Sequence, residues 1–527
     1  MYLEPREFFG QPIAPRTLPF TTGLFNGPYG AAFDQSTRVS YVHKLYSVYL
    51  QDQWKVRPNL TFTFGARYDV DVLPSGPDTK TVGNFHPTQY NNIQPRVAFA
   101  YSFRGGKDVL RGGFGIFTAP FVYSDIMVSW IGASEFNYMF SSNVGPFGPP
   151  LIKEFQNPTQ DLIGFGASGA VGLPSGIAPG PCPACTPSAF FNFATTGVYP
   201  TPFGPPVPFP LFPLEFPLGY AKKDFPNAYS EQASLELEHQ LGKSWFFTAG
   251  YQFLHALKLP VYDSVNGLPN GRDLAGVPLP CAPTGSVAPT PVGKETFCQA
   301  DPRFGFVLYV NPSGFSIYHA GTASLRKNFS NHYSILANYT WSKSIDIETT
   351  INLPNSPENY LNHNLDRAVG DNDVRNRFIL AVLGESPKEW PRVLRNFKSS
   401  ILLNAQSARF FSINTGFDTN GDLFPFNDRV GTIGRNTYKG DPYFNLDMRI
   451  QRVIPFSERV KGEFSAELFN VFNNVNVLDV NHVYGAPDFI GPIPQQFGDG
   501  VTTPAGFGTP KFVAPARQVQ FSFRLTF

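Results

Sequence analysis

Residues 517–527 read RQVQFSFRLTF and alternate strictly between polar and apolar side chains. The apolar positions are Val519, Phe521, Phe523, Leu525 and Phe527. A period of two places all five on one face of a β-strand. That face packs either into the core of a soluble β-sandwich or against lipid, with the polar face turned toward a wet interior. The rest of the chain decides between these two interpretations.

The composition favours a membrane barrel over a soluble enzyme. Charged residues make up 15% of the 527 residues, below the roughly 25% of typical soluble domains. Aromatic residues also make up 15%, and the formal charge of +1 gives no reason to expect a nucleic-acid partner. The sequence has no run of about 18 apolar residues, so no transmembrane helix is predicted. Residues 1–10 (MYLEPREFFG) do not read as a secretory signal.

Six further stretches repeat this alternation as pairs of strands joined by a turn. After Arg57, for example, Leu60, Phe62 and Phe64 alternate with polar residues. Two such runs around a short turn predict a β-hairpin. The predicted hairpins cover about 45–69, 95–116, 232–253, 315–343, 372–411 and 444–468. With the last strand, the sequence predicts thirteen strands.

The connections between these strands alternate between short and long. The short connections are 57–59, 104–107, 242–243, 328–330, 384–396 and 454–459. The long connections are 70–92, 118–227, 256–314, 344–371, 412–442 and 473–515. Transmembrane barrels have short periplasmic turns at one rim and long extracellular loops at the other, unlike most sandwiches. We therefore predict an all-β fold, an antiparallel transmembrane β-barrel in the cell outer membrane with its C-terminus in the periplasm.

The predicted strands carry a series of motifs in order. They are LYSVYLQDQWKVRPNLTFTFGARYDV at 45–70, VLRGGFGIF at 109–117, YSILANYTWSKS at 333–344, VRNRFILA at 374–381, GRNTYKGDPYFNLDMRIQR at 434–452, ELFNVFNNVN at 467–476 and RQVQFSFRLTF at 517–527. Together they resemble the C-terminal barrel of TonB-dependent outer-membrane receptors, most closely the Oar-like branch. The resemblance implies a barrel of about 22 strands closed by an N-terminal plug, which imports a scarce ligand with the help of TonB. It also implies that the barrel-assembly machinery recognises the terminal strand, here ending at Phe527.

The predicted strand count departs from that family pattern. Thirteen strands fall short of about 22, and nothing before residue 41 resembles a plug, a TonB-contacting box or a signal. Residues 1–40 are interpreted as the remnant of an extracellular loop, and residues 41–527 as the C-terminal part of the barrel. We expect a truncated or split product whose partners are outer-membrane lipid, the barrel-assembly machinery, and a missing N-terminal barrel and plug segment that contacts TonB.

No catalytic, cofactor or metal site is predicted. Four cysteines in Pro/Gly-rich stretches favour loop disulfides over a metal or redox CxxC motif, and they are Cys182, Cys185, Cys281 and Cys298. Residues 418–422 (DTNGD) resemble the start of a calcium loop. Leu423 and Arg429 stand where an EF-hand has Gly and Glu, so a solvated Asx-rich turn is favoured over a calcium site.

Charged strand residues are expected on the wet wall of the barrel, paired with one another or with a plug, and alternatively along a ligand path. They are Arg96, Arg111, Glu231, Glu236, Glu238, Lys461, Glu463 and Glu467. The expected function is uptake of an unidentified ligand. One alternative is surface adhesion or a structural role through the long loops, of which 118–227 is rich in proline. A secreted β-rich glycosidase is a third hypothesis, and it would need a carboxylate pair across a cleft.

Overall fold

The computed structural model describes thirteen long strands that form one antiparallel path. The described residues are 43–72, 89–120, 198–199, 207–208, 219–220, 226–264, 267–269, 294, 297–299, 308–347, 357–416, 419–422, 427–457, 459–495, 504 and 506–527. The path runs β1-β2-β3-β4-β8-β9-β12-β13-β15-β16-β19-β20-β23. No helix in this part of the chain is long and apolar enough to cross a membrane.

The strands of the path coincide with the thirteen predicted from the alternation. Their bounds are β1 Lys44–Arg57, β2 Leu60–Val72, β3 Gln89–Phe103, β4 Asp108–Thr118, β8 Tyr229–Leu241, β9 Trp245–Ser264, β12 Leu308–Ser330, β13 Tyr333–Asp346, β15 Asn376–Glu385, β16 Phe397–Gln406, β19 Tyr443–Pro455, β20 Lys461–Phe469 and β23 Gln518–Thr526. The predicted all-β antiparallel barrel-type fold is confirmed.

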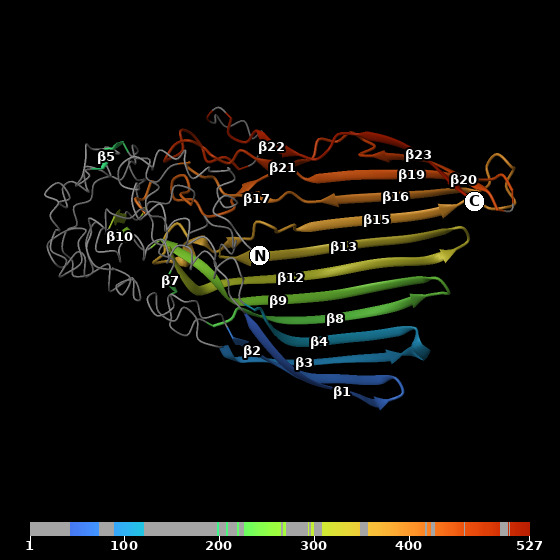
Figure 1. The fold of residues 1–527 in the computed structure, drawn as a ribbon, viewed down its shortest axis with the longest axis horizontal. Helices are drawn as coiled ribbons and strands as arrows, with labels where there is room; N and C mark the ends of the chain where they lie inside the picture. The colour runs from blue at the N-terminus through green and yellow to red at the C-terminus, as the bar shows by residue number, and fades with distance from the viewer. Residues whose placement is uncertain are drawn as a thin grey trace.

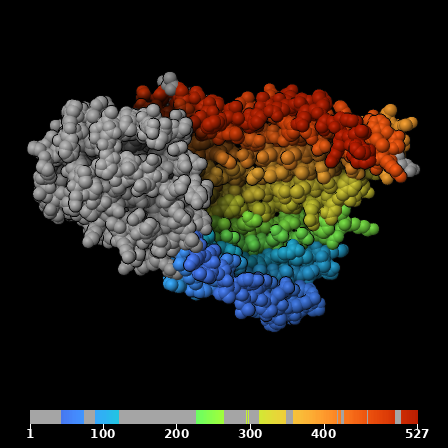
Figure 2. All heavy atoms as spheres, viewed as in Figure 1, coloured from blue at the N-terminus to red at the C-terminus, as the bar shows by residue number. Residues whose placement is uncertain are grey.

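The six short connections lie together at one end of the sheet, which we call the turn end (Figure 1). The opposite end, where the long connections leave the strands, is the loop end. Figure 2 shows the strands as successive bands of colour from β1 (blue) to β23 (red). β1 and β23 each have one neighbour on the path, so the sheet of described strands is open.

The boundaries of three predicted elements are wrong. β9 continues to Ser264 and β12 begins at Leu308, well inside the predicted loop 256–314, because the two strands pair with each other beyond the alternating region. The predicted strand 397–411 ends at Gln406, and Phe410–Phe411 forms a separate strand, β17, that pairs with β18 (Tyr438–Lys439). Loop 473–515 contains the hairpin of β21 (Val477–Val480) and β22 (Pro510–Val513).

The sheet has one apolar and one polar face. Directly opposed residues on neighbouring strands share a face, and Phe62 lies opposite Phe99 while Phe521 lies opposite Ala466. Many of the apolar side chains on this face have no covering layer, and Phe521 is 67% exposed. A soluble protein rarely exposes so large a continuous apolar surface. The lipid interpretation of the alternating strands therefore fits the sheet better than the sandwich interpretation.

Charged and histidine residues border the apolar face on the central strands. Near the turn end they form a turn-end rim of Asp108, His239 and Lys327, and near the loop end a loop-end rim of Glu231, His255, His319 and Lys343. The two rims are eight residues apart on β8, and again on β12. At about 3.4 Å per residue and a tilt of about 40°, eight residues span about 21 Å, close to the roughly 25 Å apolar band of outer-membrane barrels.

The expected position of Glu231 on the wet wall is wrong. Glu231 lies opposite Ile116 and His255, on the apolar face of the sheet. Its carboxylate is 3.4 Å from Nδ1 of His255. The charge of a glutamate predicts the wet face, whereas the register of β8 sets the face by position, because side chains alternate along a strand.

A folded loop assembly lies at the loop end. It comprises Lys294 and the described residues of 297–299, 357–372, 407–441 and 470–513. Its core is a cluster of fully or nearly buried side chains, Ile413, Val430, Tyr438, Tyr484 and Phe507. Because this core joins two long connections that are remote in the sequence, the loops fold on one another and not only on the strands.

Candidate functional site

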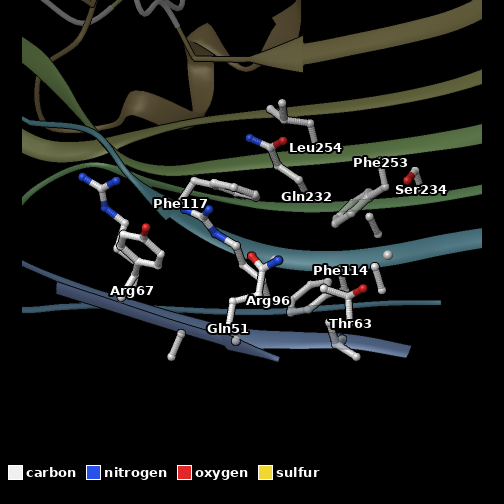
Figure 3. A pocket seen from close by; sticks show the side chains of 18 of the residues that line it. Gln51, Thr63, Arg67, Arg96, Phe114, Phe117, Gln232, Ser234, Phe253 and Leu254 are labelled. Atoms are coloured by element: carbon white, nitrogen blue, oxygen red, sulfur yellow. The ribbon is translucent and has the colours of Figure 1, made fainter. Parts of the chain in front are cut away.

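Two open cavities lie on the polar face of the described sheet, and the larger is lined from β1 to β12, so this face is the concave side of the curved sheet. The larger, of about 790 Å³, extends from β1 to β12. Its lining includes the polar side chains of Gln51, Thr63, Arg67, Arg96, Gln232, Ser234 and Gln252. The side chains labelled in Figure 3 come from β1, β2, β3, β4, β8 and β9. Such a wall can bind a polar ligand along several strands at once.

A chain of hydrogen bonds orients the two arginines of the larger cavity. Arg67 donates through Nε to Oδ1 of Asp69 at 2.8 Å and through a terminal nitrogen to Ser47 at 2.8 Å. The amide of Gln94 donates to the other Asp69 oxygen at 2.5 Å. Arg96 in turn donates to Oε1 of Gln94 at 3.2 Å. The network fixes both guanidinium groups at the wall.

Arg96 differs from Arg67 because no carboxylate pairs with it in the described part of the chain. Its guanidinium carbon lies 4.5 Å from the centre of the Phe117 ring. A guanidinium held by an aromatic ring and an amide keeps donors free for a carboxylate or phosphate, which arginine binds in a bidentate manner. Chemically, this part of the wall suits an anionic group.

The smaller cavity, of about 470 Å³, lies where the loop assembly meets the polar face. The sheet contributes Thr340, Arg377 and Asn404 among others, and β21 contributes Val477 and Leu478. The hairpin of β21 and β22 thus covers part of the polar face at the loop end. Tyr318 lines both cavities, so they lie side by side along the same face.

Buried ion pairs hold the loop assembly together. Arg429, whose side chain is 4% exposed, pairs with Glu358 and Asp366. Nζ of Lys294 lies 2.5 Å from Oε1 of Glu358 and 3.3 Å from Oδ1 of Asp428. These residues come from three different long connections. Removing one partner of such a buried pair is strongly destabilising, so the pairs fix the connections relative to one another.

His363 joins the loop assembly to the ends of two strands. Its Nε2 lies 2.8 Å from Oδ1 of Asp263 in β9, and its Nδ1 lies 2.7 Å from Oγ of Ser313 in β12. Burial lowers the pKa of His363, but the hydrogen bond and charge of Asp263 and the charge of Asp366 outweigh it, so the pKa is raised. Protonated His363 therefore strengthens this junction.

The predicted calcium-like turn is described only in part, since Asp418 lies outside the described residues. The backbone N–H of Asp422 donates to Oδ1 of Asn420 at 2.8 Å, which is an Asx turn as expected. The turn is not solvated, however, because both side chains are buried under the segment that contains Glu358. No cluster of three or more His, Cys, Asp or Glu with metal-binding geometry occurs among the described residues.

The remaining predicted site residues fall in two places. Three of the four cysteines lie outside the described residues, and Cys298 is described only as a backbone position in β11 (Phe297–Gln299). In β23, the Phe521 ring is 6.4 Å from the Phe464 ring of β20, and Phe527 is 93% exposed. The pairing of the cysteines and the recognition of the terminal strand stay predictions.

Sequence reasoning missed Arg96 as a distinctive cation, the two polar rims and the charged core of the loop assembly. For Arg96, the available signal was that Gln94, Arg96 and Phe117 all occupy positions of the polar face. For the rims, the signal was the eight-residue spacing of charged residues on the apolar face.

Comparisons with known proteins place the chain in a family. The model of the family described as "Outer membrane beta barrel domain" matches residues 18–425 and 417–520. None of the curated proteins matches. Among solved structures, the outer membrane transporter YddB from Escherichia coli is 12% identical, with a TM-score of 0.48, and the match covers 92% of this chain and 45% of that one.

Two other solved structures have similar values. The FrpB iron transporter from Neisseria meningitidis is 9% identical with a TM-score of 0.44, covering 94% of this chain and 47% of that one. The ferripyoverdine receptor of the outer membrane of Pseudomonas aeruginosa is 8% identical with a TM-score of 0.45, and the match covers 92% of this chain and 38% of that one. The chain thus spans less than half the length of each of these proteins.

Proposed function

The chain belongs to the outer membrane beta barrel domain family, and we propose that it forms the wall of a TonB-dependent receptor that takes up a ligand. The observation that carries this proposal is the concave polar face with its cavity of about 790 Å³ behind an apolar outer face. A polar interior within an apolar band is the arrangement of a transmembrane passage. The motifs at 45–70 and 517–527, which resemble the Oar-like branch, support it.

The ligand class follows from the cavity wall. Arg96 presents a guanidinium held by Phe117 and Gln94, and the neighbouring lining is rich in amides and hydroxyls. We infer a polar ligand with at least one anionic group. Replacing Arg96 with Gln removes the charge but keeps a hydrogen-bonding side chain, so it should weaken uptake of such a ligand by about tenfold or more.

The orientation in the membrane follows the lengths of the connections. The loop end, with its folded loop assembly, faces the outside, and the turn end faces the periplasm together with Phe527. The terminal strand, from Val519 to Phe527, then presents its aromatic end to the barrel-assembly machinery. Deletion of Phe527 alone should reduce the amount of protein inserted in the outer membrane. The control variant Phe527→Tyr keeps a terminal aromatic residue and should be inserted in the normal amount.

The open edges of β1 and β23 require further strands. Neither has a second neighbour among the described residues, and unpaired backbone groups in lipid cost several kcal/mol each. We therefore propose that additional strands, and with them a plug that contacts TonB, complete the barrel. Cross-linking from cysteines placed on the outer edge of β1 should capture the completing strand.

The experiment that tests the function is membrane fractionation followed by an uptake assay. The full chain in its native cell should fractionate with the outer membrane and migrate faster on gels before heating than after. Uptake should require TonB. Recovery as a soluble monomer without detergent would contradict both the fold assignment and transport, whereas outer-membrane localisation with no TonB-dependent uptake would contradict transport alone.

A second function, surface adhesion through the long loops, is favoured by one observation. The loop assembly has its own buried core around Ile413 and Tyr484, and a folded surface unit can present a stable binding face. Binding of cells or matrix that persists in a TonB-deficient strain, and that disappears when the loop assembly is unfolded by Ile413→Asp, would favour adhesion over uptake.

A further inference from the structure

We infer that the loop-end rim on β9, β12 and β13 binds a lipid whose headgroup carries phosphate, with an acyl chain lying in a groove on the apolar face below. The inference does not rest on transport. It rests on the lipid-facing assignment of the apolar face and on the placement of its few cations.

Two lysines of this region carry charges that no carboxylate pairs with in the described part of the chain. Lys343 is an exposed residue of β13 and lies directly opposite His319 of β12. Lys258 of β9 places its Nζ 5.2 Å from the centre of the Tyr229 ring, and Tyr229 shares the apolar face with Leu257. Lys343 thus lies beside His319, whereas Lys258 lies farther toward the loop end, between the residues of β9 that pair with Phe315 and Gly314.

The backbone at Lys258 is shaped in a way that aims its side chain. Lys258 has a φ of 56°, in the left-handed region that non-glycine residues rarely adopt. It is the extra residue of a bulge, since Leu257 pairs with Phe315 and Leu259 pairs with Gly314. Bulges redirect side chains, and such strained positions persist where the surroundings determine them. Here the bulge brings the lysine Nζ to the ring of Tyr229, on the apolar face and beyond the loop-end rim.

His319 provides a further donor beside Lys343. Oη of Tyr251 lies 2.6 Å from Nδ1 of His319, and the Phe253 ring centre is 5.2 Å from the imidazole. Together these contacts orient the ring and leave Nε2 for another partner. The nearby acidic residue, Glu231, is 3.4 Å from His255, so its charge is directed to that histidine. Among the described residues, the two lysines therefore exceed the single carboxylate in this region.

Below His319 the apolar face is open at Gly321. Gly321 lies between Tyr251 and Trp341 in the register, and the nearest atom to a side chain built there is in the Trp341 ring at 4.0 Å. Tyr251 and Trp341 are 47% and 60% exposed. The missing side chain leaves a slot between two exposed aromatic side chains, two residues from His319 along β12 toward the turn end. Such a slot fits an acyl chain whose phosphate lies at the rim.

A phosphate-bearing lipid explains these features together. Lysine is a strong point-charge donor to phosphate, and basic side chains near a membrane surface each contribute about 1 kcal/mol toward anionic lipids. A protein partner would need no acyl slot, and a second copy of this face would bring the like charges of Lys258 and Lys343 together. Charge complementarity and depth therefore select a lipid as the occupant.

The test measures lipid binding to the full chain in detergent by native mass spectrometry. The probes are diphosphorylated lipid A and the same lipid with both phosphates removed. We expect the double variant Lys258→Gln/Lys343→Gln to bind the phosphorylated probe at least tenfold more weakly than the unmodified chain. The matched control is Lys398→Gln, which removes one exposed lysine from the polar face and should leave binding unchanged.

A second variant tests the groove independently. Gly321→Leu fills the slot while keeping every cation, so it should weaken binding of the phosphorylated probe by several fold without altering the heat-modifiable mobility of the protein. The inference is overturned by equal binding of phosphorylated and dephosphorylated probes, by unchanged binding in the double-lysine variant, or by an equal loss in Lys398→Gln.

Discussion

Arginine introduced along the apolar face of β23 should destabilise the protein in proportion to its depth. Phe523 lies opposite Phe464, which lies opposite Arg452 of β19. The guanidinium of Arg452 lies 5.1 Å from the Phe397 ring centre and donates to a carbonyl at Arg392, in the turn. This places Phe523 at the turn-end boundary of the apolar band.

Val519 is four residues farther along β23, half of the eight-residue interval between the rims. It therefore lies near the middle of the band, with Phe521 between it and the boundary. Arginine on the lipid face costs about 2–4 kcal/mol at the midplane and about 0–1 kcal/mol near the interface. We expect Val519→Arg to cost the most, Phe521→Arg less, and Phe523→Arg the least.

The assay is equilibrium unfolding of the full chain in lipid vesicles, followed by tryptophan fluorescence and by heat-modifiable mobility. Each arginine variant is compared with alanine at the same position, because alanine also removes contacts such as that of Phe521 with Phe464. The control, Gln520→Arg, places the charge on the polar face opposite Glu467, where it should cost little. Equal costs at all three depths, or a cost at Gln520 like that at Val519, would refute the assignment of faces.

Three further predictions concern the loop assembly. Arg429→Ala leaves the buried Asp366 carboxylate without its cation and should destabilise the assembly by about 3–5 kcal/mol, measured as faster limited proteolysis of the loops. His363 has a raised pKa, so its pair with Asp263 stabilises the assembly fully below the ordinary histidine pKa. This stabilisation is lost as the pH rises through the raised pKa. Hydrogen-exchange protection of the assembly should therefore fall with rising pH, and His363→Gln should abolish this dependence. Ile413→Ala should cost about 2–5 kcal/mol in the assembly, while the unfolding midpoint of the sheet stays unchanged.

The strands could be predicted from the sequence because their signal is local. Alternation over eight to twelve residues is independent of what lies elsewhere, and it identified all thirteen strands of the path. Turn chemistry was equally local. At the hairpin of β12 and β13, for example, Asn331 and His332 have φ of 51° and 70°, as the tight turns of hairpins require. Errors arose at strand ends, where β9 and β12 pair through residues that do not alternate.

The loop assembly could not be predicted, because its contacts join residues that are far apart in the sequence. The contact of Lys294 with Asp428 crosses 134 positions, and no local pattern marks either residue as half of a pair. The buried state of Asn420 and Asp422 has the same origin. Polarity and Asx-turn chemistry correctly indicated a turn there, but whether a turn is solvated depends on the segments that fold over it.

The polar rims lie between these two cases. The charge of Glu231 alone predicts the wrong face. Its position and its charge together identify it as a polar residue on the apolar face. Glu231 and His239 are separated by eight residues on one face of β8, and His319 and Lys327 by eight on β12. Polar residues that interrupt an apolar face at a spacing close to the height of the apolar band are expected at its two borders. A cation at such a boundary that no carboxylate pairs with among the described residues, like Lys343, is placed to meet charged headgroups.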